Sequence, residues 1–396
     1  MRCVLTVTGT RSDWGAMTPV YAAIAATPGL RQECVLTGMH LLSRFAESRR
    51  EVERNFPGPI HVAPVCDEDD TNAGMAKALG RGVVHMAEAL SHVRPDILLL
   101  QGDRGEMLAA AIAGAHMNVP VVHLSGGDRS GTIDDSIRHA VSTLAHVHLT
   151  TCEASSRVLL GRGEAPGRIL AVGEPGLDVI RAMDYLDRET ICAELGLDPA
   201  KPLIVVAQHP VTTESDQAGP QMRATLDAVL RLARTRDMQA VVTAANSDAG
   251  GEAINAVIAA QAGDPRLRVR ATLGARRFLS LLRAAVVLVG NSSSGIWEAP
   301  SFGLPAVNVG TRQHGRLRAT NVLDVPHHDA EEILAALETA VLDPVFRDKA
   351  AQAVNPYGDG HAGDRTARVL GGLDLDDPRL VAKWLDAGRD FLAFAR

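Results

Sequence analysis

The sequence is poor in aromatic residues, in basic charge and in long apolar runs, and each shortage excludes a class of protein. Aromatic residues make up only 3% of the 396 residues, so the cores must be built from aliphatic side chains. The formal net charge of −7 lacks the basic excess that general nucleic-acid binding requires. No apolar run approaches the length of a membrane helix. We therefore expect no nucleic-acid partner and no membrane association.

Cysteine is also scarce, and its pattern argues against a disulfide framework or a zinc site. The five cysteines are scattered without CxxC spacing, which favours buried, reduced thiols. His139, His146 and His148 lie near acidic residues, but no HExxH motif accompanies them. We expect neither a metal nor another cofactor. The first predicted strand begins almost at Met1 with no targeting segment before it, so we expect a soluble, cytoplasmic protein.

Strand-like and helix-like segments alternate along the whole chain, which is typical of parallel sheets with right-handed crossovers. A turn at Gly173–Gly176 separates two such series and is the expected hinge. The chain is also too long for one compact core. The fold class predicted is α/β, with two Rossmann-like, doubly wound domains at 1–175 and 176–365 that face each other across a cleft. The first series predicts strands at 3–8, 33–37, 97–101, 119–123, 146–150 and 169–172, and helices at 18–26, 41–54, 72–93, 106–117, 133–144 and 153–161. The second predicts strands at 203–208, 240–243, 267–270, 286–289, 306–309 and 322–325.

Polar motifs follow these strands, at the sheet edge where doubly wound proteins bind ligands. The richest motif is GGDRSGTIDDSIRHA at 126–140. If its second half is helical, Asp134, Asp135, Arg138 and His139 share one helix face. Such a face suits acid–base groups around a small polar substrate. A solvated ion-pair cluster at an ordinary helix start is the alternative interpretation.

Two other motifs of the first half combine a glycine turn with a charged side chain. The turn at 9–13 offers backbone N–H groups to an anion, and Arg11 adds a forked cation. Asp103 and Arg104 follow the strand at 97–101 and place a carboxylate beside a cation. A plain surface loop around Arg11 and a helix cap at Asp103 remain open. Neither a GxGxxG fingerprint nor a Walker loop is present, which argues against NAD and ATP.

The second half carries a serine-rich turn, GNSSSG at 290–295. Its N–H groups and hydroxyls suit a diphosphate, and Glu298, about one turn into the helix expected next, is placed to hold ribose hydroxyls. A serine-rich helix cap is the alternative. His209 ends the strand at 203–208, where a structural histidine is equally compatible with the sequence. Arg312 adds a cation after the strand at 306–309.

With these motifs collected, the chain resembles the UDP-N-acetylglucosamine 2-epimerase family, and more closely its hydrolysing branch. The resemblance implies the glycosyltransferase-B arrangement, with C-terminal helices at about 366–396 returning to the first domain. We also expect a homodimer or a dimer of dimers. The motifs that carry the resemblance span nearly the whole length: TGTRSD at 8–13, TGMHL at 37–41, GDR at 102–104, GGDRSGTIDDSIRHA at 126–140, QHPVTT at 208–213, GNSSSG at 290–295, GTRQ at 310–313 and NPYGDG at 355–360.

The resemblance also implies roles for individual residues of this chain. The residues implied to contact the nucleotide sugar are Arg11, His40, Arg104, Asn246, Ser292, Ser293, Glu298 and Arg312, with Asn246 on the uracil side. The catalytic neighbourhood implied is Asp103, Asp134, Arg138 and His209, with Asp135 nearby.

The resemblance implies a reaction that eliminates UDP across carbons 1 and 2 of the sugar, giving a 2-acetamidoglucal. Water or UDP then adds to carbon 1 while a proton returns to carbon 2 from the other face. Many relatives have a glutamate where this chain has Ser125, so Asp128, three residues on, is a candidate replacement base. We predict hydrolysis to N-acetylmannosamine and UDP.

Other outcomes stay open from the sequence alone. A non-hydrolysing epimerase would return UDP-N-acetylmannosamine, and a UDP-2,4-diacetamido sugar is an alternative substrate. A retaining glycosyltransferase or a non-catalytic UDP-sugar sensor would share the UDP-binding turn with Glu298. Neither of these would need Asp103, Asp134 and Arg138 to converge.

Overall fold

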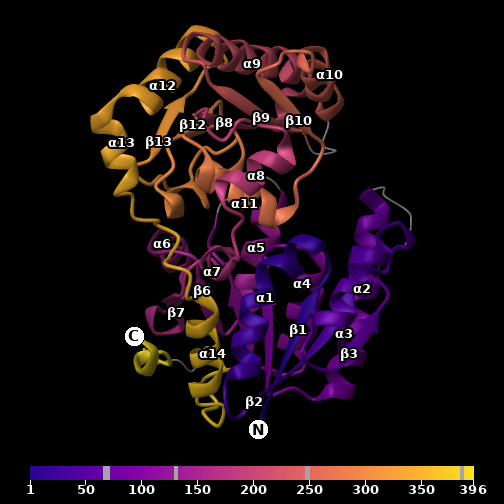
Figure 1. The fold of residues 1–396 in the computed structure, drawn as a ribbon. Coiled ribbons are helices and arrows are strands. Elements are labelled where there is room, and N and C mark those ends of the chain that lie inside the picture. Colours follow the sequence, from indigo (N-terminus) through magenta and orange to yellow (C-terminus); the bar gives the residue numbers. More distant parts are fainter. Residues whose placement is uncertain (66–71, 129–132, 246–249, 384–387) are drawn as a thin grey trace. The chain divides into compact units, whose positions relative to one another are not determined.

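The computed structural model describes residues 1–65, 72–128, 133–245, 250–383 and 388–396 (Figure 1). The chain divides into two compact units, each of which is described by itself. The first unit comprises Met1–Arg181 and Tyr357–Arg396, and the second comprises Ala182–Pro356. The C-terminal segment therefore belongs to the same unit as the N-terminus.

The first unit is built on a seven-stranded parallel sheet in the order β3-β2-β1-β4-β5-β6-β7. Its inner strands are apolar and buried along almost their whole length, as expected when helices cover both faces. The strands are β1 (Arg2–Thr8), β2 (Leu30–Thr37), β3 (Ile60–Ala63), β4 (Ile97–Gln101), β5 (Val121–Leu124), β6 (Val147–Thr150) and β7 (Ile169–Ala171).

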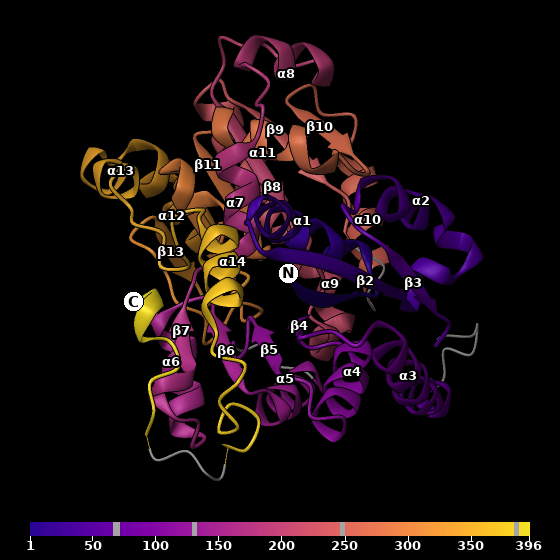
Figure 2. The ribbon, with the colours of Figure 1, turned by 90° about the horizontal axis from the view of Figure 1, so that it is seen from below.

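Helices cover both faces of this sheet. One core cluster joins the sheet to α1 (Arg11–Ala26) and α14 (Ala362–Gly372), which lie side by side (Figures 1 and 2). A second cluster joins the opposite face to α3 (Asn72–Val93), α4 (Gly105–His116) and α5 (Ile133–Leu144). The remaining α-helices of this part of the chain are α2 (Ala46–Asn55), α6 (Glu153–Gly161) and α7 (Pro175–Ala182).

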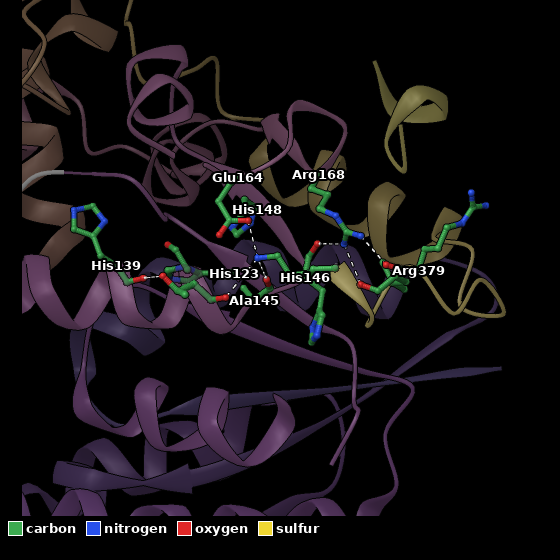
Figure 3. A network of polar contacts seen from close by, with 12 residues as sticks. His123, His139, Ala145, His146, His148, Glu164, Arg168 and Arg379 are labelled. Carbon is green, nitrogen blue, oxygen red and sulfur yellow. Dashed lines mark hydrogen bonds and ion pairs between the residues drawn. The ribbon is translucent and has the colours of Figure 1, made fainter. Parts of the chain in front are cut away.

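Buried polar contacts hold the C-terminal segment on the first unit (Figure 3). Arg168 is fully buried, and its guanidinium donates to the carbonyl oxygens of His146 at 2.9 Å and Arg379 at 2.6 Å. Glu164 accepts from Lys383 Nζ at 2.6 Å and contacts His148 Nε2 at 3.0 Å. Because burying a charge is costly unless it is paired, these contacts fix where the segment docks.

The second unit contains a six-stranded parallel sheet in the order β10-β9-β8-β11-β12-β13. Its main core cluster packs the sheet against α9 (Ala218–Thr235), α10 (Gly251–Gln261) and α12 (Ala330–Leu342). The strands are β8 (Leu203–Ala207), β9 (Gln239–Thr243), β10 (Leu267–Arg270), β11 (Val287–Gly290), β12 (Ala306–Val309) and β13 (Val322–Val325). The other α-helices are α8 (Arg188–Leu195), α11 (Gly274–Ala284) and α13 (Pro344–Ala351).

The two parallel sheets confirm the predicted α/β class, while some local predictions were wrong. Helix α1 begins at Arg11 rather than near residue 18, because Thr10 caps it and Pro19 is accommodated inside the helix. The helix expected at 41–54 is instead two short 3₁₀ helices followed by α2. Strand β3 was not predicted, since it has only four residues. None of the helices described is long and apolar enough to cross a membrane.

Candidate functional site

Each sheet has one point where the strand order reverses, and four of the predicted polar motifs lie there. In the first unit this point falls between β1 and β4, and in the second between β8 and β11. Loops at the carboxyl ends of such strands form the ligand sites of doubly wound proteins. The segments that follow these strands are 9–13 and 102–104 in the first unit, and 208–213 and 291–295 in the second, and α1 begins within the first of them at Arg11.

Arg138 is the centre of a charged cluster in the first unit. Helix α5 places it where only 8% of the residue is exposed. Its guanidinium forms an ion pair with Asp103, and a second nitrogen lies 3.8 Å from Asp128 Oδ2. Asp103 therefore does not cap α4, whose N-cap is Arg104 without a side-chain hydrogen bond. The interpretation of Asp103 as the cap of α4 was wrong, because its carboxylate forms an ion pair with Arg138.

Hydroxyl groups from the turn after β6 and from α6 orient Asp128. Its Oδ1 accepts from Thr151 Oγ1 at 2.7 Å and from Ser155 Oγ. Gly127 precedes it with φ +81°, and a side chain there would collide with the Ser155 carbonyl, so this turn requires glycine. Thr151 and Ser155 were not among the predicted site residues. They lie in a different stretch of sequence and carry no motif of their own.

A buried histidine holds the loop that carries Asp103. His123 on β5 has its Nε2 2.8 Å from the Gly102 carbonyl oxygen and its Nδ1 3.0 Å from Ser142 Oγ on α5. Burial lowers the pKa of His123 to about 4, so the ring is neutral at physiological pH. A neutral ring can donate to the carbonyl and accept from the hydroxyl at the same time. Sequence reasoning did not select His123, which sits inside an apolar strand.

Ser125 marks the departure from the family pattern. It follows β5 with φ +63°, an uncommon conformation for a residue other than glycine, and is 5% exposed. Its Oγ is buried without a hydrogen-bond partner in the part of the chain that the structure describes. A strained backbone beside Asp128 and His123 is typical of a functional loop.

The predicted contacts Arg11 and His40 differ in their surroundings. Arg11 is exposed at the first residue of α1. His40 is buried, with Nε2 3.1 Å from Thr8 Oγ1 and Nδ1 2.7 Å from Ser48 Oγ, and burial lowers its pKa. Both ring nitrogens of His40 are therefore engaged within the protein. This environment suits a residue that shapes the loop more than one that binds substrate directly.

A pocket of about 390 Å³ opens beside this cluster, within the first unit. Asp134 and Arg104 line it, together with Glu106 and largely apolar side chains from α3. Asp134 and Asp135 both lie in the first turn of α5 and are half-buried. The structure thus brings Asp103, Asp128 and Arg138 into direct contact, and places Asp134 on the wall of an adjoining pocket.

The serine turn of the second unit is formed by 3₁₀ helices. Residues Ser293–Gly295 and Ala299–Phe302 each form one, so the longer helix expected around Glu298 was wrong. Ser292 caps the first by accepting from Ser294 N at 3.3 Å. Glu298 is half-buried, and its Oε2 is shielded from solvent without a hydrogen-bond partner among the described residues. Burial raises the pKa of Glu298.

Asn291 ties the remaining loops of this site together. Its side chain exchanges hydrogen bonds with the His209 backbone, from His209 N at 2.7 Å and to His209 O at 2.8 Å. Its carbonyl oxygen accepts from Arg312 at 3.2 Å and from Gln313 at 2.8 Å. The structure therefore gathers His209, Ser292 and Arg312 around Asn291, a buried residue that the sequence analysis did not select.

Two further points concern the predicted uracil contact and metal binding. Asn246 lies outside the described residues, so its predicted place on the uracil side is not addressed by the structure. Within the described ranges, no group of three or more His, Cys, Asp or Glu side chains is arranged to hold a metal ion.

Comparison with known proteins identifies the family. The family model described as UDP-N-acetylglucosamine 2-epimerase matches residues 22–371. This chain belongs to the UDP-N-acetylglucosamine 2-epimerase family. A Legionella pneumophila protein named UDP-N,N'-diacetylbacillosamine 2-epimerase (hydrolyzing) is 38% identical, over 95% of this chain and 97% of the relative. A Campylobacter jejuni protein named GDP/UDP-N,N'-diacetylbacillosamine 2-epimerase (hydrolyzing) is 30% identical, over 85% and 88%.

Solved structures agree with the fold of this family member. The crystal structure of UDP-GlcNAc 2-epimerase from Neisseria meningitidis bound to UDP-GlcNAc matches with a TM-score of 0.75 and 18% identity. The match covers 93% of this chain and 99% of that one. The predicted family and the two Rossmann-like units are thus confirmed. The roles of individual site residues remain predictions.

Proposed function

We propose that this protein is a hydrolysing UDP-N-acetylglucosamine 2-epimerase, which converts UDP-N-acetylglucosamine and water into N-acetylmannosamine and UDP. The observation that carries the proposal is the ion pair of Arg138 with Asp103, beside Asp128, at the strand-order reversal of the first unit. A guanidinium next to a carboxylate favours its ionised form, which a proton acceptor needs. A retaining glycosyltransferase or a non-catalytic UDP-sugar sensor would not need Asp103 and Arg138 to converge.

The proposed reaction begins with elimination. A carboxylate removes the proton from carbon 2, a double bond forms between carbons 1 and 2, and UDP leaves with the electron pair of the broken carbon–oxygen bond. Water then adds its oxygen to carbon 1 and gives up a proton to a carboxylate, while the other carboxyl group donates a proton to carbon 2 from the opposite face, so that one water is consumed in total. We assign the two acid–base roles to Asp103 and Asp134, because these carboxylates come from different elements around Arg138.

UDP is assigned to the second unit, and the acid–base groups to the first. The serine turn offers the hydroxyls of Ser292 and Ser293 to the diphosphate, with Arg312 as the nearby cation. The buried Oε2 of Glu298 supports a ribose contact, since a buried acceptor without a partner is costly and a ligand hydroxyl would satisfy it. We also assign Asp135 to the proposed site of the first unit and His209 to that of the second.

The hydrolytic outcome is supported by the two relatives whose names contain the word hydrolyzing. Ser125 has no carboxylate and cannot act as a carboxylate base. Asp128, the candidate replacement, lies 3.8 Å from the Arg138 guanidinium, and we assign it the role of holding Arg138. Those two names also favour a second substrate, UDP-N,N'-diacetylbacillosamine, a 2,4-diacetamido sugar. The chemistry at carbons 1 and 2 is the same for both sugars.

We further propose that the enzyme acts in the cytoplasm. We also propose that it forms a homodimer or a dimer of dimers, and light scattering of the purified protein tests this oligomeric state.

Incubation with UDP-N-acetylglucosamine and no acceptor tests the proposed function. We expect UDP and free N-acetylmannosamine in equal amounts. Recovery of UDP-N-acetylmannosamine would show a non-hydrolysing enzyme instead. Free N-acetylglucosamine would indicate slow hydrolysis by a transferase, and an unchanged substrate would support a binding protein.

A further inference from the structure

Lysine is rare in this chain, and one lysine is mostly buried. Of the 40 basic residues, only four are lysines: Lys77, Lys201, Lys349 and Lys383. Lys383 lies in the C-terminal segment of the first unit, with 27% of its side chain exposed. An ammonium group directs three donors tetrahedrally, whereas a guanidinium presents its donors in one plane. A lysine at this place in an arginine-rich chain therefore indicates acceptors that a planar group would not match.

The ammonium group of Lys383 has three acceptors, which come from the ends of two helices (Figure 3). Nζ donates to the carbonyl oxygens of Ala145 at 3.0 Å and Thr143 at 3.4 Å, at the carboxyl end of α5. It also donates to Glu164 Oε2 at 2.6 Å. Glu164 belongs to the end of α6, because its backbone N–H donates to the Leu159 carbonyl oxygen at 3.1 Å. One ammonium group thus joins the carboxyl ends of α5 and α6.

The positive charge of Lys383 is compensated where it lies. Burial alone would raise the pKa of Glu164, but His148 and Lys383 beside the carboxylate lower it, so Glu164 stays ionised. Carbonyl groups at the carboxyl end of a helix lack partners within the helix and carry partial negative charge, so a cation there is favourable. Lys383 therefore contacts one full and two partial negative charges.

Buried contacts hold the backbone just before Lys383. The guanidinium of Arg168 donates to the carbonyl oxygens of Arg379 at 2.6 Å and Leu380 at 3.0 Å. The same group donates to the carbonyl oxygen of His146, the residue before β6, at 2.9 Å. Because this backbone is fixed on the sheet of the first unit, Lys383 binds the two helix ends from a firm base.

The opposite ends of the same two helices meet at Asp128. Arg138, on α5, lies 3.8 Å from Asp128 Oδ2, and Ser155, on α6, donates to Asp128 Oδ1. Arg138 precedes Ala145 by seven residues, which is about 10 Å along the helix axis. Helices this short move as rigid rods, so a shift at the ends that Lys383 joins changes the separation of the groups around Asp128.

We propose that Lys383 is a positioning residue for the proposed acid–base groups. By joining α5 to α6 at their carboxyl ends, it sets the distance between Arg138 and Asp128, and thereby the orientation of Asp103, which is paired with Arg138. The inference rests on the proposed function. It gives the C-terminal segment a part in the reaction, although none of the predicted site residues lies in that segment.

The test compares kcat and KM of wild-type enzyme with those of two variants of Lys383. Lys383→Met keeps most of the side-chain length but removes the charge and all three donors. We expect its kcat to fall at least about tenfold while KM stays within about twofold, because small misplacements of reacting groups are costly. Lys383→Arg keeps the charge beside Glu164, but its planar fork cannot match all three acceptors, so kcat should fall about threefold.

A matched control separates this effect from the loss of any lysine. Lys201→Met removes an ion pair with Asp237 in the second unit, where both side chains are exposed. We expect wild-type kcat and KM in this variant. Circular dichroism checks that every variant folds, and Lys383→Arg carries the test if Lys383→Met does not fold.

A double-mutant cycle with Ser155→Ala distinguishes positioning from a general loss of structure. Ser155→Ala removes a hydrogen bond to the Asp128 carboxylate, at the other end of α6. Two changes that act on one geometry are not independent. The combined variant of Ser155→Ala with the Lys383 change should therefore lose less kcat than the product of the two single losses.

Wild-type kcat in either Lys383 variant would overturn the inference. Losses that multiply in the cycle, or a change confined to KM, would also overturn it. In each of these cases the 2-epimerase reaction would stand. A wild-type enzyme that releases no manno sugar from either proposed substrate would instead refute the proposed function itself.

Discussion

His123 Nε2 lies 2.8 Å from the carbonyl oxygen of Gly102, the residue before Asp103. Through Nδ1, the same ring contacts Ser142 on α5, the helix that carries Arg138 and Asp134. One buried imidazole thus joins the loop and the helix that supply the proposed acid–base groups. We infer that His123 is a positioning residue for Asp103.

Replacing His123 by phenylalanine should therefore lower kcat at least about tenfold while KM changes little. The ring volume is nearly kept, but both hydrogen bonds are lost, and small misplacements of reacting groups are costly. Steady-state kinetics measure the split between kcat and KM. His116→Phe, on the exposed end of α4, is the control. An equal loss in the control, or a change confined to KM, would contradict the positioning role.

Acid should destabilise the fold through buried histidines. Burial lowers the pKa values of His123 and His146 to about 4, from the value of 6.5 that an exposed histidine has. Between those values the unfolded chain binds protons that the folded chain does not, so stability falls as pH falls from 6.5 towards 4. At pH 5 the loss is on the order of 2 kcal/mol for each histidine. Urea unfolding at pH 7 and pH 5 measures it, and His123→Phe should flatten the dependence. Equal stability at the two pH values would contradict this account.

The two proposed acid–base groups can be tested by isosteric changes. Asp103→Asn and Asp134→Asn should each lower kcat at least about a hundredfold, as expected for general acid–base catalysis. UDP affinity should stay the same, because UDP is assigned to the second unit. Glu153→Gln, exposed in the first turn of α6, is the control for charge loss at a helix start. Turnover near that of wild-type enzyme in either aspartate variant would remove that residue from its role.

Glu298→Ala tests the ribose contact. If Oε2 accepts from a ribose hydroxyl, its loss removes a charge-assisted hydrogen bond worth about 1.5–3 kcal/mol. UDP binding should then weaken roughly ten- to a hundredfold in calorimetric titration. Glu331→Ala removes a surface carboxylate paired with Arg231 and should bind UDP normally. Unchanged affinity in Glu298→Ala would refute the contact.

Much of the architecture could be predicted from the alternation of apolar strands and helices. Predicted strands such as 97–101 and 306–309 agree with the structure, because buried parallel strands are nearly continuous apolar runs. The predicted strand 267–270 also agrees, although it is a partly buried edge strand in which arginines alternate with apolar residues. The exact bounds and types of some helices were harder to predict from the sequence. Pro19 obscured the start of α1, and the turns after β11 are 3₁₀ helices that a serine-rich sequence does not distinguish from α-helix.

The site could be predicted only where charged residues stand in motifs. Asp103 and Arg138 were selected from separate motifs, and the fold brings them together. Their supports were missed because His123, Thr151 and Asn291 act through tertiary hydrogen bonds between distant segments. The spacing of residues in the sequence does not predict hydrogen bonds between such distant segments.

The most direct test of the proposed mechanism is the NMR spectrum of the product formed in deuterated water. Elimination through a glucal requires the proton of carbon 2 to leave and another to return from solvent on the opposite face. We predict a free sugar of manno configuration that carries deuterium at carbon 2. A product that keeps its original proton at carbon 2 would contradict the mechanism.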